Sequence, residues 1–301
     1  MGDPAHTLHR MANDPWRVVL ITTVAPVAGA LTEALRGLGH VPVAVMSARR
    51  RRPGSPSPWS ITDATAPPDV DVLFPRDRHS IEALMRAYHP DLAICWGYPW
   101  KIPLAALEVP RLGSINNHPA FLPRHRGPIP VSWAIREGDG SFGVTWHRMD
   151  AELDTGAILA QTSVPDRDNE FSFEELGPRM LEAALQILPR ALERLAAGDP
   201  GDRQGADGAS WAGHFDADYA QIDWSRPAQE IHRQVRAWAF ATGTEDVVGP
   251  IATIDGRPVR VTRTSLVEPP GSDADDGPIR MNAGDGPIWV VAWEPAEAEL
   301  G

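Results

Sequence analysis

Three polar residues that together could form a catalytic site lie in two short segments of the chain. Asn116 and His118 are two residues apart in the segment SINNHPAFLPRHRG, and Asp154 follows in the segment MDAELDTGAIL. Side chains two positions apart on a strand point to the same face, so a strand ending at His118 would aim an amide and an imidazole at one spot. These groups can hydrogen-bond an oxygen, and a carboxylate can take up or relay a proton. We therefore treat all three as candidate catalytic residues.

The elements that must position these residues follow the pattern of an open, mostly parallel, Rossmann-like α/β sheet. Strands are predicted from apolar runs at 16–23, 41–46, 71–74, 91–96 and 112–116, and helices from the periodic segments at 27–38 and 80–88. Strand and helix in alternation indicate right-handed parallel units. Ligands of such sheets bind at the carboxyl ends of the strands, which is where the Asn116 segment would lie.

Composition divides the chain into four predicted parts. Residues 1–15 carry no motif and are expected to form a disordered extension, and residues 16–200 form the catalytic domain. The Gly-, Asp- and Pro-rich segment 201–210 reads as a linker. Residues 211–301 contain short strand-like pieces separated by Gly and Pro turns, which predicts a small β-rich, barrel-like C-terminal domain.

Charge and cysteine content restrict the classes of function. The chain of 301 residues has a net charge of −12, and residues from 201 onward carry 8 arginines against 17 acidic residues. Broad binding to a polyanion is therefore not expected. The single cysteine, Cys95, lies in an apolar run and is expected to be buried in a reducing compartment. No segment reaches the roughly 18 to 20 apolar residues of a membrane span, so we expect a soluble, cytoplasmic protein.

Other cofactor motifs are missing from the sequence. The first predicted strand is followed by TTVAPVAG instead of a GxGxxG fingerprint, so no dinucleotide site is predicted, and no cluster with metal-ligand spacing is found. His147 lies in the middle of a strand predicted at 142–149. We expect it to be a packed or surface histidine rather than a catalytic one.

The combined motif resembles one known family. The pattern N-x-H-P-x-x-L-P-x-x-R-G, then G-V-T, then L-D-T-G-x-I-L, resembles the folate-dependent formyltransferases. That family includes methionyl-tRNA formyltransferase, glycinamide ribonucleotide transformylase, and the sugar and hydroxyornithine formyltransferases. The resemblance covers about Trp16 to Gln161 and continues weakly in the segment IDWSRPAQEIHRQVRAW. Two positions depart from the family pattern, where Ala120 replaces a common serine and Phe121 a leucine.

The resemblance implies a role for each candidate residue. Asn116 and His118 would bind the formyl oxygen of 10-formyltetrahydrofolate while an acceptor amine attacks, and Asp154 would keep His118 charged and relay the departing proton. No metal is required. The residues implied to contact or shape the folate site are Trp96, Gly97, Tyr98, Trp100, Ile102, Pro123 and Gly156. Packing would explain the aromatic side chains of this loop equally well, so both interpretations stay open.

The acceptor must be inferred from charge. The acidic C-terminal half disfavours tRNA, whereas the Arg49 to Arg52 run lies where tRNA-formylating relatives carry a basic loop. We favour a small molecule with an amine or hydroxylamine as the acceptor. The alternatives are a methionyl-tRNA formyltransferase acting on charged initiator tRNA and a 10-formyltetrahydrofolate hydrolase. The oligomeric state is left open.

Overall fold

The computed structural model of the chain describes residues 14–48, 61–62, 65–166, 172–241, 249–272 and 277–296. These residues form two compact units, neither of which is continuous in sequence. The first unit comprises Met1–Arg124, Gly143–Val164 and Glu175–Ala209, and the second comprises His125–Phe142, Pro165–Glu174 and Ser210–Gly301. The Arg49 to Arg52 run and most of the predicted extension at 1–15 lie outside the described residues.

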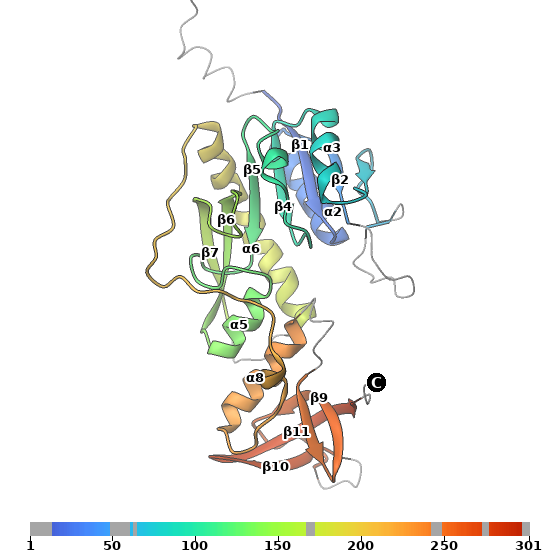
Figure 1. Cartoon of the computed structure of the whole chain (residues 1–301), viewed down its shortest axis with the longest axis vertical. Coiled ribbons are helices and arrows are strands. Elements are labelled where there is room, and N and C mark those ends of the chain that lie inside the picture. The colour runs from blue at the N-terminus through green and yellow to red at the C-terminus, as the bar shows by residue number, and fades with distance from the viewer. Residues whose placement is uncertain are drawn as a thin grey trace, which may run out of the picture. The chain divides into compact units, whose positions relative to one another are not determined.

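A seven-stranded sheet organises the first unit (Figure 1). Its strands are β1 (Arg17–Thr22), β2 (Val41–Met46), β3 (Asp71–Leu73), β4 (Leu92–Trp96), β5 (Ser114–His118), β6 (Ser141–Arg148) and β7 (Ile158–Pro165). Their order is β3-β2-β1-β4-β5-β6-β7. The strands from β3 to β5 pair in parallel, and β6 runs antiparallel to β5. The predicted open, mostly parallel sheet is confirmed.

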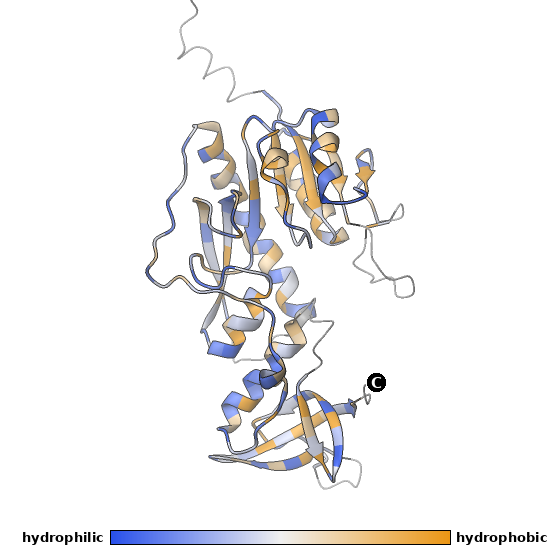
Figure 2. Ribbon diagram, in the orientation of Figure 1, coloured by the Kyte–Doolittle hydropathy of each residue, from blue (hydrophilic) through white to orange (hydrophobic). Residues whose placement is uncertain are grey.

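Helices cover both faces of this sheet because its central strands are apolar on both sides (Figure 2). The helices of the first unit are α2 (Ala25–Gly37), the 3-10 turn η1 (Arg78–Ser80), α3 (Ile81–Tyr88), α4 (Leu104–Leu107) and nearly all of α6 (Phe173–Ala196). Helices α3 and α4 pack on one face, where Ile81, Met85 and Leu107 share a core cluster with alternate residues of β1, β2 and β4. Within the described segments, no helix combines the length and apolarity needed to cross a bilayer.

Helix α6 runs through two prolines. The sequence favours a kink or break at Pro189, but a single helix of 24 residues contains both Pro178 and Pro189. A proline inside a helix costs about 3 kcal/mol or more, so other contacts must offset that cost. The buried side chains of Leu188 and Leu192 provide apolar packing. In addition, Trp146 Nε1 on β6 donates to the Ala184 carbonyl at 2.9 Å.

Asn117 is an amide in an apolar position of β5. The strand register aligns it with Trp96 on β4 and Trp146 on β6, and the rings of these tryptophans meet edge to face at 5.9 Å between centroids. Asn117 is only 2% exposed, and neither atom of its amide finds a hydrogen-bond partner within the described part of the chain. A buried polar group left unpaired costs about 1 to 3 kcal/mol.

Replacing Asn117 by leucine is therefore expected to stabilise the protein. Leucine has a similar size and carries no polar atom, so Asn117→Leu should raise the free energy of unfolding by about 1 to 2 kcal/mol. Urea denaturation followed by circular dichroism would measure the change. The matched variant Asn117→Asp should lower stability, because it buries a charge in the same place. A loss of stability in Asn117→Leu would show that the amide is satisfied in solution.

The second unit combines helices with an antiparallel sheet. Its helices are α5 (Pro130–Glu137), α7 (Ala217–Ala220) and α8 (Ala228–Phe240), and its strands are β8 (Ile251–Ile254), β9 (Arg257–Ser265), β10 (Ile279–Ala283) and β11 (Gly286–Pro295). The strand order is β10-β11-β9-β8. Val235 of α8 packs into a cluster with Val259 and Val261 of β9 and Val290 of β11. The predicted small β-rich C-terminal domain is confirmed.

His232 on α8 is held neutral by its surroundings. Its Nδ1 lies 2.9 Å from the Thr264 hydroxyl on β9. Burial, followed by the charges of Arg236 and Arg233, lowers the pKa of His232 from 6.5 to about 4. A histidine whose pKa is lower in the folded than in the unfolded state contributes its full stability above the unfolded pKa and loses it as the pH falls.

The stability of the protein is therefore expected to fall between pH 6.5 and pH 4 partly through His232. At pH 4 the loss of unfolding free energy that is due to His232 would reach about 3 kcal/mol. The variant His232→Gln keeps a hydrogen-bonding group without the titration, so its unfolding free energy should decline less steeply over the same interval. If the unfolding free energies of the two proteins declined by the same amount over this pH interval, His232 would not be responsible for the loss of stability.

Candidate active site

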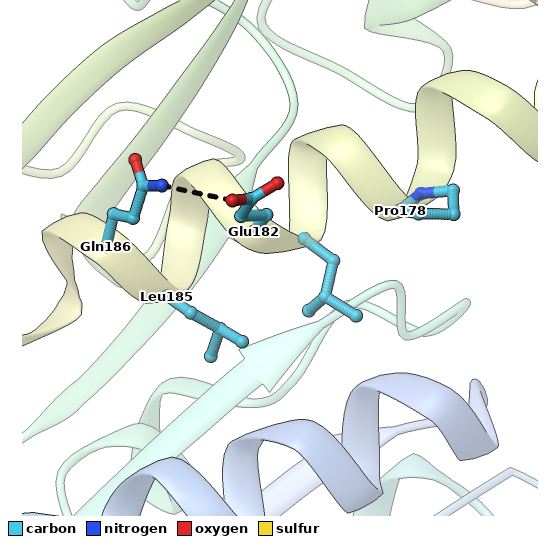
Figure 3. A pocket seen from close by; sticks show the side chains of 5 residues that line it. Pro178, Glu182, Leu185 and Gln186 are labelled. Carbon is cyan, nitrogen blue, oxygen red and sulfur yellow. Dashed lines mark hydrogen bonds between the residues drawn. The ribbon is translucent and has the colours of Figure 1, made fainter.

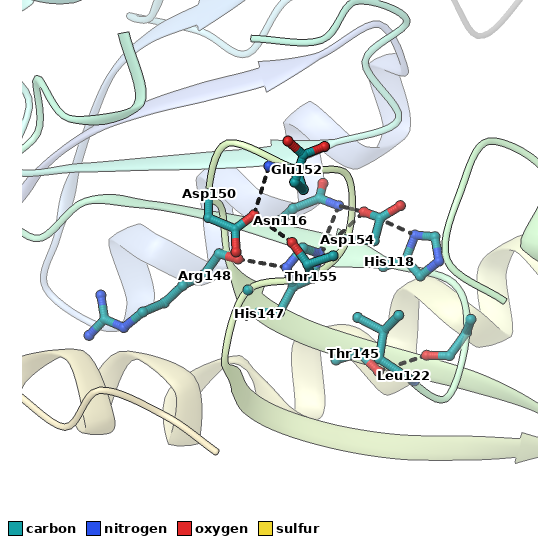
Figure 4. A network of polar contacts seen from close by, with 12 residues as sticks. Asn116, His118, Leu122, Thr145, His147, Arg148, Asp150, Glu152, Asp154 and Thr155 are labelled. Atoms are coloured by element: carbon teal, nitrogen blue, oxygen red, sulfur yellow. Dashed lines mark hydrogen bonds and ion pairs between the residues drawn. The ribbon is translucent and has the colours of Figure 1, made fainter. Parts of the chain in front are cut away.

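The three predicted residues meet over the carboxyl-terminal half of β5. Asn116 and His118 project from the same face of the strand, and Asp154 reaches them from the loop between β6 and β7 (Figure 4). Asp154 Oδ1 lies 3.5 Å from Asn116 Nδ2 and 3.5 Å from His118 Nδ1. The side chains of His118 and Asp154 are 5% and 11% exposed, so water screens this contact only weakly. The structure thus brings together all three residues, while their catalytic roles stay a proposal.

His147 is a fourth member of this cluster. Its Nε2 lies 3.2 Å from Asn116 Nδ2 and 3.5 Å from Asp154 Oδ1, and its Nδ1 lies 2.7 Å from the Arg148 carbonyl oxygen. Because a carbonyl can only accept, Nδ1 carries a hydrogen, and in this tautomer Nε2 can accept from the Asn116 amide. His147 therefore orients the side chain of Asn116.

The sequence alone predicts a packed or surface histidine at position 147 and does not indicate this contact with Asn116. The residue is buried, as a packed histidine would be, but it also contacts two candidate residues. The available signal was the two-residue period of β6, which puts His147 and Thr145 on one face. Only the antiparallel register, which pairs His147 with Asn116 and Thr145 with His118, shows that this face is the face of the site.

The loop that carries Asp154 is closed tightly at its base. The Arg148 amide donates to the Ala157 carbonyl at 2.9 Å, and a Cβ at Gly156 would lie 1.8 Å from the Arg148 carbonyl oxygen. Only glycine fits there. Gln204 then donates from Nε2 to the carbonyls of Asp154 at 2.9 Å and Gly156 at 2.7 Å. These contacts hold Asp154 in its left-handed conformation, with φ of 57°.

A second set of contacts shapes the tip of the same loop. Asp150 Oδ1 accepts from the Glu152 amide at 3.1 Å and from the Thr155 hydroxyl at 2.7 Å (Figure 4). Glu152 Oε2 in turn lies 3.7 Å from Lys101 Nζ. This exposed ion pair joins the Asp154 loop to the loop that follows β4.

The turn after His118 is fixed by polar side chains of the neighbouring strands. The Thr145 hydroxyl donates to the Ala120 carbonyl at 2.7 Å, and Gln161 Nε2 donates to the Leu122 carbonyl at 2.9 Å. Pro123, one of the residues implied to shape the folate site, lies half-buried in this turn. The backbone that follows the imidazole is therefore held by β6 and β7.

The loop from Trp96 to Ile102 combines packing with exposure at the end of β4. Ile102 belongs to the core and is 4% exposed, and Tyr98 and Trp100 pack against the same core cluster. Their rings meet edge to face at 5.7 Å between centroids. Gly97 is exposed at the tip, where the Thr23 hydroxyl donates to its carbonyl at 3.0 Å. Packing accounts for the inner side of the loop and leaves its outer edge available for a ligand.

Two polar groups, one in this loop and one near the end of β4, are buried. The Tyr98 hydroxyl finds no hydrogen-bond partner among the described residues, and burial raises the pKa of this phenol. Burial, and after it the charge of Asp154, raises the pKa of the Cys95 thiol to about 12. Cys95 is therefore an unreactive thiol, as its apolar sequence context predicts.

Two other features of the described chain are separate from this cluster. A shallow hollow of about 520 Å³ lies on α6 and is lined by Pro178, Leu181, Glu182, Leu185 and Gln186 (Figure 3). Its surface is mostly apolar, and its one lining carboxylate, Glu182, accepts a hydrogen bond from Gln186 Nε2 at 3.4 Å. In the second unit, His125, Glu137 and Asp139 place possible metal-ligand atoms within 4.8 Å of one another. His125 Nε2 already lies 2.8 Å from Asp139 Oδ2, so this histidine is satisfied without an ion.

Comparison with known proteins establishes the family. Residues 16–192 match the formyl transferase family, and residues 215–299 match the formyl transferase C-terminal domain. The chain belongs to the formyl transferase family. The prediction made from the Asn116, His118 and Asp154 motifs is confirmed at this level.

Curated relatives of this formyltransferase include methionyl-tRNA formyltransferases. One from Pseudomonas fluorescens is 36% identical over 217 residues, which cover 69% of this chain and 64% of the relative. Another, from a second strain of that species, is 33% identical over 273 residues, which cover 87% of this chain and 82% of the relative. The first match therefore spans less than two thirds of that relative's length.

Solved structures share the fold of this formyltransferase at lower identity. An N-formyltransferase from Helicobacter canadensis superposes with a TM-score of 0.66 at 18% identity, covering 92% of this chain and 99% of that one. HypX from Aquifex aeolicus superposes with a TM-score of 0.65 at 20% identity, covering 95% of this chain and 45% of that one. Both similarities show the fold.

The position of His147 generates a testable prediction. In His147→Phe an aromatic ring remains but the Asn116 amide loses the nearer of its two acceptors, so we expect the rate of formyl transfer to fall about 10- to 100-fold. The side-chain amide signals of Asn116 in nitrogen-15 NMR spectra should also shift and broaden. Thermal denaturation would confirm that the variant is folded. An unchanged rate together with unchanged Asn116 signals would show that His147 only packs.

Proposed function

We propose that this formyltransferase moves the formyl group of 10-formyltetrahydrofolate to an amine or hydroxylamine of a small molecule. The observation that carries the proposal is the convergence of Asn116 and His118 on Asp154, with both contacts at 3.5 Å. An amide donor, an imidazole and a carboxylate are the groups that acyl transfer to an amine requires.

The chemistry needs stabilisation of negative charge at one oxygen. When the acceptor nitrogen attacks the formyl carbon, charge develops on the formyl oxygen, and the bond from that carbon to the folate nitrogen then breaks. The Asn116 amide and the His118 imidazole would donate to this oxygen, and such a donor contributes about 3 to 4 kcal/mol in favourable cases. Because Asp154 lies beside His118 Nδ1, its charge favours the protonated ring, which donates more strongly.

The same residues could also transfer the protons that the reaction moves. The acceptor nitrogen loses one proton as its new bond to the formyl carbon forms, and the folate nitrogen gains one as it leaves. Asp154 would accept the first proton and return it through His118 or water. The clamp from Gln204 to the backbone of Asp154 keeps the carboxylate in position for both steps.

Several observations support folate as the donor. The solved structure of HypX from Aquifex aeolicus contains tetrahydrofolic acid, and that of the Helicobacter canadensis enzyme contains folinic acid. In this chain the loop after β4 lies next to the site, because Cys95 pairs with Asn116 in register and Lys101 contacts the Asp154 loop through Glu152. Its partly exposed aromatic side chains suit a flat, polar-edged ring.

The proposed folate residues have different tasks. Trp96, Gly97, Tyr98 and Trp100 would contact the donor from the loop after β4. The backbone around the donor would instead be fixed by Ile102, Pro123 and Gly156. Ile102 is a core residue, and Gly156 allows its loop to pack closely against the Arg148 carbonyl.

A small acceptor is favoured by charge. Residues from 201 onward carry a net charge of −9, which repels the phosphates of an RNA backbone. The Helicobacter canadensis enzyme was solved with the small amino sugar nucleotide dTDP-3-aminofucose. The second candidate is charged initiator tRNA, which is favoured by the 33 to 36% identity to methionyl-tRNA formyltransferases.

A direct assay would test the donor and the acceptor together. Purified protein is incubated with 10-formyltetrahydrofolate and, separately, with amino sugar nucleotides, hydroxylamines and charged initiator tRNA. We expect a formylated small-molecule product, detected by mass spectrometry. Asn116→Ala, His118→Ala and Asp154→Asn should each reduce turnover at least about 100-fold with little change in thermal stability. His79→Ala, which changes an exposed histidine on η1, should keep full activity.

Each contrary result has a distinct meaning. Near wild-type turnover in any of the three variants would refute the role of that residue. Formylation of tRNA without formylation of any small amine would replace the favoured acceptor by the second candidate. Formate release without any acceptor would instead reveal a hydrolase.

A further inference from the structure

The second unit contains a polar hollow that formyl transfer does not use. It measures about 260 Å³ and lies between α5, α7 and α8. The residues that line it are Arg136, Glu137, Tyr219, Arg226, Glu230 and Arg233. We refer to this hollow as the arginine pocket. Three of its six lining residues carry a guanidinium group, and two of these come from the chain beyond residue 201, whose net charge is −9.

Arg136 presents a guanidinium that aromatic rings hold in place. Its Cζ lies 4.0 Å from the ring centroid of Tyr219, 4.5 Å from that of Trp133 and 5.7 Å from that of Phe215. Ring faces attract the cation but do not satisfy the N–H groups in its plane. Within the described chain Arg136 forms no ion pair with a carboxylate. Its orientation is thus fixed while its capacity to donate hydrogen bonds is largely unused.

Arg233 is a second guanidinium without a carboxylate partner in the described segments. Its plane covers Gly138 at the end of α5, where an added Cβ would lie 2.4 Å from Arg233 Cζ. Its Nε is buried and makes no hydrogen bond to any described residue. Gly138, with φ of 73°, is the residue that leaves room for this side chain. A buried donor without an acceptor is costly, so the hydrogen-bonding capacity of this lining side chain is not fully used by the described residues.

The remaining charges leave the pocket positive. Arg226 pairs with Glu230, so these two side chains neutralise each other. Arg136 and Arg233 then face a single lining carboxylate, Glu137. Burial raises the pKa of Tyr219 to about 12, and this phenol stays neutral beside the arginines.

We propose that the arginine pocket binds the phosphate group of a small phosphorylated molecule. Guanidinium forks match the oxygens of a phosphate in pairs, and two pre-oriented forks in one concavity suit a dianion better than a monovalent carboxylate. The volume exceeds that of one phosphate, which leaves room for part of the molecule that carries it. The net charge of −9 from residue 201 onward favours a small ligand over an RNA backbone as the source of the phosphate.

Binding can be measured without formyl transfer, so this inference does not depend on the proposed function. Isothermal titration calorimetry of the full chain with inorganic phosphate, pyrophosphate and a nucleoside diphosphate should show binding by at least one of them. Arg136→Gln and Arg233→Gln should each weaken it at least about 10-fold, because each removes a charged fork. Arg136→Lys should not restore it, because lysine lacks the planar fork. Asp154→Asn should bind as the wild type does.

A control variant separates the pocket from general electrostatics. Arg260→Gln removes an arginine of the same unit that is exposed and paired with Glu294, and it should leave the affinity unchanged. Equal weakening in Arg260→Gln, no binding of any phosphate at millimolar concentration, or full affinity in both pocket variants would each overturn the proposal. Binding of an RNA duplex without binding of any small phosphate would overturn the choice of a small ligand.

Discussion

The antiparallel pairing of β6 with β5 is the contact on which the candidate site depends. It sets His147 beside Asn116, and it carries the chain back to the beginning of β5, where Ile115 pairs with Arg148. From there the following loop must return over the strand before Asp154 can reach His118. Because the loop folds back over its own strand, its backbone must pass close to the Arg148 carbonyl, and the glycine at position 156 allows this. The side-chain amide of Gln204 then holds the backbone of the loop through two hydrogen bonds.

The sequence was most informative where local geometry decides the outcome. The two-residue period of a strand places Asn116 and His118 on one face without any knowledge of neighbouring strands, and the alternation of apolar runs with helical segments indicates the parallel sheet. Asp154 is linked to them by the proton chemistry of a carboxylate and by the family motif, because no local period relates it to β5. His147 could not be placed, because its role depends on the direction in which β6 runs and on its register, and both are set by pairing across the sheet. Two residues depart from local preferences. The buried amide of Asn117 has no hydrogen-bond partner among the residues that the structure describes, and Pro189 lies inside helix α6.

The net charge shows that the chain is acidic, but it does not show how charged side chains are distributed in the structure. Arg136 on α5 is far in sequence from Arg226 and Arg233, and the fold brings the three together because α5 packs on α8 within the second unit. Pairing also differs within the group, since Arg226 is neutralised by Glu230 while the other two lack a carboxylate partner among the described residues. Totals over a sequence cannot reveal such a distribution, because they ignore which charges cancel at contact distance.

The clamp formed by Gln204 also bears on how members of this family can be recombined. Gln204 lies after the last residue of α6 and before the match to the C-terminal domain begins at residue 215, yet its side chain holds the backbone of the proposed catalytic carboxylate. The stretch between the two family matches therefore takes part in holding the candidate site and is not a neutral spacer. A chimaera that joins this N-terminal half to the C-terminal half of a relative should be cut after residue 204, because a cut at the end of α6 would exchange a residue that positions Asp154.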